Sequence, residues 1–129
     1  MPLDPEEFLA DWAQRAEQQT LLTTELSQRM QEMTAAAESP GGEVVVTVGS
    51  SGGLTELRLA DHAMRKPAAD LAEIILAASR QAQARLARQI TELATGLYGA
   101  DSETAAFIGG SYTAQFPEPP VEDEERERR

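Results

Sequence analysis

Serine and glycine residues near the middle of the chain are the first candidates for chemistry. The stretch Gly49-Ser50-Ser51-Gly52-Gly53 has the letters of the G-x-S-x-G nucleophile elbow, in which a serine is poised for acyl transfer. That motif requires a turn from a strand into a helix. Here the stretch lies between two runs of strand-type residues, so it predicts a hairpin turn. It also lacks the Lys-Ser/Thr ending of a phosphate-binding loop.

Histidine and carboxylate residues are the next candidates. The single histidine, His62, adjoins Asp61 after the second of these runs, and we expect it on a surface loop. With no cysteine and one histidine, only scattered carboxylates remain as metal ligands. The sequence therefore predicts no catalytic residue, no metal site and no cofactor.

Arginine and lysine side chains are the remaining candidates, because they can replace counterions on nucleic-acid phosphates. The candidate phosphate contacts are Arg15, Arg29, Arg58, Arg65, Lys66, Arg80, Arg85 and Arg88. For the last three, a solvated helix face is the competing interpretation.

The net charge of the chain is −11, which argues against nucleic acid as a partner. Residues 1–38 hold eight acids and two bases, and residues 96–129 hold eight acids and three bases. Residues 39–95 hold six of each. Any contact with DNA is therefore expected in the neutral centre, while the acidic ends suit a basic protein partner.

Two long helices flank the candidate residues. Apolar side chains recur at helical spacing from Pro5 to about Met33. They do so again from Pro67 to a stop at Gly96 or Gly99. Each helix would be roughly 43–45 Å long at 1.5 Å per residue.

Strands fill the interval between the helices. Val44–Val48 is the densest β-branched run, and Leu54–Leu59 alternates apolar and polar residues. The turn signal Ser39-Pro40-Gly41-Gly42 predicts a further short strand over residues 34–39, folded back on 43–49. The fold class is therefore α+β, with a domain over residues 1–99. Residues 100–129 are expected to form a disordered, acidic, proline-containing tail.

The helix lengths predict a homodimer. A compact domain of this size has a radius of gyration of about 14 Å, so both helices would overhang the sheet and expose their apolar stripes. A symmetric second subunit would bury them. The candidate interface residues are Leu22, Leu26, Met30, Val44, Val46, Val48, Leu86, Ile90 and Leu93.

This succession resembles the YbaB/EbfC family of bacterial nucleoid-associated proteins. The resemblance is carried by a glutamine- and methionine-bearing first helix, by residues 39–48 (SPGGEVVVTV), by residues 53–59 (GLTELRL), and by the helix over residues 70–82. It covers about residues 8–95 and implies an α-β-β-β-α subunit, a tweezer-like homodimer and DNA binding with little sequence preference. Actinobacterial members also occur beside specialised secretion systems, and the arginine-rich, lysine-poor composition resembles such a source.

Two functions follow from these observations. The first is a dimeric, non-enzymatic, nucleoid-associated DNA-binding protein of the cytoplasm, since neither a signal peptide nor a membrane span is expected. The alternative is an acidic protein-interaction module of the same fold, secretion-associated or regulatory, that does not bind DNA. It would use the acidic ends and the segment from Phe107 to Phe116.

Overall fold

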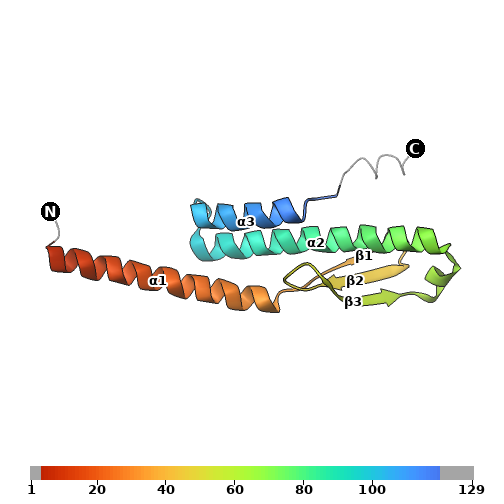
Figure 1. Cartoon of the computed structure of the whole chain (residues 1–129), viewed down its shortest axis with the longest axis horizontal. Helices are drawn as coiled ribbons and strands as arrows, with labels where there is room; N and C mark the ends of the chain where they lie inside the picture. Colours follow the sequence, from red (N-terminus) through yellow and green to blue (C-terminus); the bar gives the residue numbers. More distant parts are fainter. Residues whose placement is uncertain (1–3, 120–129) are drawn as a thin grey trace.

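The chain forms a three-stranded sheet covered on one face by a long helix, as shown by a computed structural model (Figure 1). The structure describes residues 4–119. Its elements are α1 (Pro5–Glu32), β1 (Ala35–Glu38), β2 (Val44–Val48), β3 (Leu54–Leu59), a short 3-10 helix η1 (Asp61–Arg65), α2 (Ala68–Tyr98) and α3 (Glu103–Gln115). The order of helix, three strands and long helix confirms the predicted α+β fold.

The strands form one antiparallel sheet in the order β1-β2-β3. Their register places Ala35 opposite Val48, and Val44 opposite Leu59. Because side chains alternate along a strand, Val44, Val46 and Val48 point to one face, and all three are fully buried there. The short strand predicted before the valine run is present as β1.

Glycines at positive φ close both hairpins. Gly42 in the β1–β2 turn has φ 74°, and Gly52 in the β2–β3 turn has φ 87°. Residues with a Cβ disfavour this left-handed region. At Gly52 there is also no space for a side chain, because the ring of Phe116 occupies the position of a Cβ.

α2 supplies the other half of the core. Its buried stripe repeats at one-turn spacing and consists of Ala78, Ala82, Leu86 and Ile90. The helix lies over β1 and β2 rather than over β3. Leu57 and Leu59 share the inner face with the buried valines, yet they remain 45% and 42% exposed.

The region after α2 differs from the prediction of disorder from residue 100. Residues Glu103–Gln115 form α3, which lies along α2 (Figure 1). The Ser102 hydroxyl caps this helix by accepting a hydrogen bond of 3.2 Å from the Ala105 N–H. A Cβ on Gly109 would lie 2.9 Å from the Thr91 side chain, so small residues here allow close helix packing. The remainder of the predicted tail, residues 120–129, lies outside the described residues.

Most residues predicted for the dimer interface are instead buried within one chain. Leu26 is 5% exposed, and the three valines, Leu86 and Ile90 are 0% exposed. Leu22, Met30 and Leu93 are half-buried. The six buried residues are covered within one chain, because the sheet, α3 and the end of α1 lie over the apolar stripe of α2.

The first half of α1 extends away from the rest of the molecule (Figure 1). Its large apolar side chains are exposed: Phe8 by 57%, Leu9 by 62% and Trp12 by 63%. Among the residues described, no helix has both the length and the apolar character needed to cross a bilayer.

Candidate nucleic-acid interface

Three of the eight candidate cations are paired with acids of their own element. Arg15 lies 2.9 Å from Asp11, and Arg29 lies 2.8 Å from Glu25, each one turn away on α1. On β3, Arg58 Nε donates to Glu56 at 2.6 Å. Such exposed pairs stabilise the protein by at most about 1 kcal/mol. They nevertheless place a carboxylate where a phosphate would have to bind.

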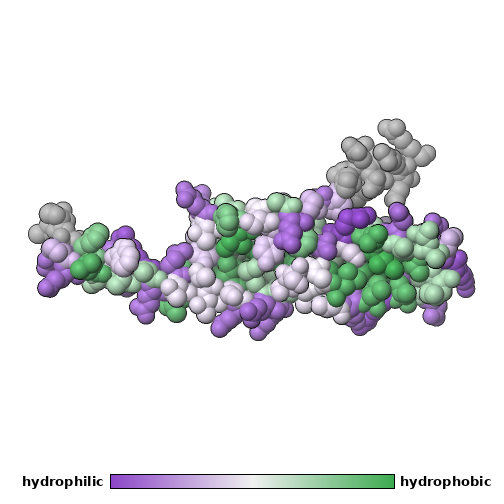
Figure 2. All heavy atoms as spheres, viewed as in Figure 1, coloured by the Kyte–Doolittle hydropathy of each residue, from purple (hydrophilic) through white to green (hydrophobic). Residues whose placement is uncertain are grey.

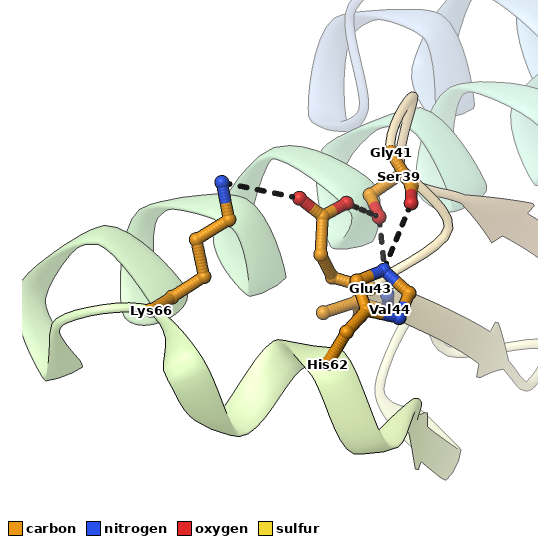
Figure 3. A network of polar contacts seen from close by, with 6 residues as sticks. All are labelled: Ser39, Gly41, Glu43, Val44, His62 and Lys66. Atoms are coloured by element: carbon orange, nitrogen blue, oxygen red, sulfur yellow. Dashed lines mark hydrogen bonds and ion pairs between the residues drawn. The ribbon is translucent and has the colours of Figure 1, made fainter.

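Lys66 belongs to a polar network that joins the β1–β2 turn to the start of α2 (Figure 3). Its Nζ lies 3.6 Å from one carboxylate oxygen of Glu43, and the other oxygen accepts a 2.9 Å hydrogen bond from the Ser39 hydroxyl. That hydroxyl in turn accepts the Val44 N–H at 3.0 Å. Nearby, His62 Nε2 lies 3.1 Å from the Gly41 carbonyl oxygen. Lys66 therefore has a structural partner.

Glu43 is the charged centre of this network. Its side chain is buried, and its carboxylate fills the space where a Cβ on Gly41 would lie. The pKa of Glu43 is lowered from 4.5, first by a hydrogen bond from its own backbone and then by the Ser39 hydroxyl. Desolvation opposes this shift, and Lys66 adds a smaller lowering contribution. The carboxylate is consequently ionised at neutral pH.

In the middle of α2 the cations form no ion pair with an acid of their own helix, although Glu92 follows Arg88 by one turn. Residues 74–91 contain neither Asp nor Glu, and they carry Arg80, Arg85 and Arg88, all exposed. Arg85 and Arg88 are three residues apart and therefore share a helix face. Arg85 Nη1 donates to the Ala36 carbonyl at 2.8 Å, which holds it beside β1.

Arg88 is paired with Glu118, which follows α3. Within residues 4–119, neither Arg65 nor Arg80 makes an ion pair. The structure thus divides the eight candidates. The cations of α1 and β3 each form an ion pair with an acid of the same element. Arg65 lies on η1, and Lys66, which follows it, pairs with Glu43. The three arginines of α2 form no ion pair with an acid of α2.

The fold and this distribution of charge can be compared with known proteins. The chain matches the YbaB/EbfC DNA-binding family over residues 7–100, a range that holds α1, the sheet and α2. The chain belongs to this family. YbaB/EbfC proteins are nucleoid-associated DNA-binding proteins. No match was found among curated proteins. α3 lies beyond the matched range.

The candidate phosphate contacts were selected from the sequence by residue type, and this selection could not separate paired from unpaired cations. The acid-free stretch of α2 is the signal that could have done so, because it is visible without any structure. The Ala36 and Glu118 contacts join segments far apart in the chain and had no such signal. Ser50 and Ser51 lie between β2 and β3, so the expected hairpin turn is confirmed. His62 lies on η1 rather than on an irregular loop.

Proposed function

We propose that this YbaB/EbfC protein is a homodimer of the bacterial nucleoid, and that it binds duplex DNA with little sequence preference through arginines of α2. The supporting observation is the acid-free stretch: three exposed arginines lie within residues 74–91 of a chain whose net charge is −11. Arginines of α1 and β3 would have to leave their carboxylates before binding phosphate. Among the three arginines of α2, only Arg88 pairs with a carboxylate in the described residues, that of Glu118, so we expect the phosphate contacts on this helix.

Binding to a labelled duplex across a salt series tests the DNA proposal. Replacing Arg80, Arg85 and Arg88 with glutamine should weaken binding to unrelated sequences by a similar factor. Each lost phosphate contact should reduce the slope of log K against log salt by about 0.9. The matched comparison sets the double replacement of Arg85 and Arg88 against the double replacement of Arg15 and Arg29 on α1, where the effect should be smaller. Equal effects would place the contacts elsewhere, and no binding to any duplex at low salt would overturn the proposal.

The inner face of β3 is the proposed dimer interface. Leu57 and Leu59 remain uncovered beside the first half of α2, where Leu76 is 55% exposed. Figure 2 shows hydrophobic residues gathered at the end of the molecule that holds β3 and the start of α2. An exposed apolar patch beside a half-covered sheet is typical of a subunit interface. A second copy that covers β3 completes the layer that α2 leaves open.

Analytical ultracentrifugation at micromolar concentration tests the dimer. The wild-type protein should sediment as a dimer, and Leu57→Lys should shift it towards monomer because a charge would be buried. Leu9→Lys on the extended part of α1 is the control, with a side chain that is 62% exposed, and it should leave the dimer intact. A stable wild-type monomer would refute the dimer, and a dimeric Leu57→Lys variant would refute this interface.

A second candidate function, binding of a basic protein partner, is favoured by the extended half of α1. Phe8, Leu9 and Trp12 are exposed on it, beside the acids Glu6 and Glu7. An apolar surface with acids around it complements a basic amphipathic segment. It is a poor surface for phosphates.

The only tryptophan of the chain, Trp12, reports on this surface directly. Titration with a Lys/Leu amphipathic peptide should shift its emission to the blue if the surface accepts a basic partner. Titration with duplex DNA should leave the emission unchanged if DNA binds α2. A shift with DNA alone would contradict both assignments.

A further inference from the structure

The segment that follows α3 is held against the family domain by an aromatic anchor. Phe116 is half-buried and packs against the main core, with its ring 6.4 Å from that of Tyr112. The ring lies over Gly52 of the β2–β3 turn. The same turn is tied to α2, because Gln83 Nε2 donates to the Gly52 carbonyl at 2.9 Å.

This anchor places a carboxylate on the proposed DNA surface. Two residues beyond Phe116, Glu118 accepts a hydrogen bond from the Arg88 guanidinium. Proline at 117 restricts the backbone between them. An acid tethered in this way competes at a high effective concentration for the group that it contacts.

A competing anion can displace Glu118 from its ion pair with Arg88. The side chains of this pair are 52% and 57% exposed, and an ion pair this exposed to water is weak. A phosphate that reaches Arg88 could therefore replace the carboxylate. Arg88 lies within residues 7–100, whereas Glu118 lies beyond them, so the carboxylate comes from outside the matched family domain. Residues 120–129, which lie outside the described residues, hold five further acids and three arginines.

We propose that the segment after α3 is an intramolecular competitor for DNA, in which Phe116 is the anchor and Glu118 occupies Arg88 in place of a phosphate. The inference rests on the proposed binding of DNA by α2. It predicts that this protein binds DNA more weakly, and with a smaller dependence on salt, than its arginines alone would allow.

Duplex binding by the full-length protein tests the competitor. Glu118→Gln should tighten binding by up to about five-fold at low salt, the upper range for an exposed ion pair. It should also steepen the salt slope by up to about 0.9, because Arg88 becomes free to neutralise a phosphate. Asp101→Asn removes the same charge from the exposed turn between α2 and α3. It should change little.

A double-mutant cycle separates competition at Arg88 from a general effect of charge. In an Arg88→Gln background, Glu118→Gln should no longer tighten binding. If the gain persists there, or if Asp101→Asn matches it, the competitor is overturned while DNA binding by α2 stands. If no variant binds DNA at any salt concentration, the proposed function fails, and the competitor fails with it.

Discussion

Replacing Gly52 with alanine should destabilise the fold and at the same time strengthen DNA binding. Gly52 has φ 87°, and the ring of Phe116 fills the position of its missing Cβ. An alanine must therefore adopt an unfavourable backbone conformation and displace the ring. Moving the ring releases the segment that carries Glu118.

The stability cost has two parts. A residue with a Cβ in the left-handed region costs about 1–2 kcal/mol. Full burial of a phenylalanine contributes about 1.5–3 kcal/mol, so displacing the half-buried Phe116 costs about 1 kcal/mol. The free energy of unfolding should therefore fall by about 2–3 kcal/mol.

Urea unfolding followed by circular dichroism, at one fixed protein concentration, measures this change. Gly53→Ala is the matched control. Gly53 has no positive φ, and its nearest neighbour to a new Cβ is the Ser51 hydroxyl at 3.8 Å, so the change should stay within about 0.5 kcal/mol. In a Phe116→Ala background, Gly52→Ala should cost only its backbone part.

Three results would refute this reasoning. If Gly52→Ala costs no more than Gly53→Ala, neither the backbone conformation nor the ring contact matters. If its cost is the same with and without Phe116, the ring contact contributes nothing. If duplex binding by Gly52→Ala stays at the wild-type level while Glu118→Gln tightens it, the anchor does not hold the carboxylate in place.

Two further predictions concern α3 and the network of Figure 3. Gly110→Ala should raise stability by about 0.5–1 kcal/mol, because the residue is helical with open space around it. Gly109→Ala should lower stability by about 1 kcal/mol because the new Cβ overpacks Thr91. Thermal unfolding of the two variants checks both changes. If Gly109→Ala is more stable than Gly110→Ala, the packing of α3 described above is contradicted. The pKa of Glu43 is lower in the folded protein than in the unfolded chain, so the unfolded chain binds the proton first as pH falls. The carboxylate therefore stabilises the fold at pH values above its ordinary pKa of 4.5. This contribution is lost as pH falls through the pKa of the folded protein. In urea unfolding at pH 6, 4.5 and 3, the stability difference between wild type and Glu43→Gln should shrink towards acid, and a constant difference would rule out this contribution.

Local patterns explain why the sequence predicted the sheet and the long helices well. Val44–Val48 was bounded correctly because β-branched residues favour strands wherever they occur, and the Gly41-Gly42 turn required a partner strand before it. The sequence left the end of α2 at Gly96 or Gly99, and the helix ends at Gly99, which has φ 99°. Each of these signals acts over a few residues.

α3 was missed because its signal is not local. Its sequence is rich in small residues, and its apolar side chains do not form a clear stripe. Tertiary packing supplies most of the stability of a short helix. This segment becomes helical because Ala105 and Gly109 allow it to pack closely on α2. The burial of Leu86 and Ile90 within one chain was missed for the same reason, because α3 and the sheet cover them.

The sequence by itself therefore determined the α+β order, the acidic ends and the acid-free middle of α2, since residue type and spacing decide these features. The tertiary structure decided which partners the cations have. It paired Lys66 with Glu43, placed Arg85 against β1 and brought Glu118 to Arg88. These contacts depend on distances between segments remote in the chain, and only folding sets those distances.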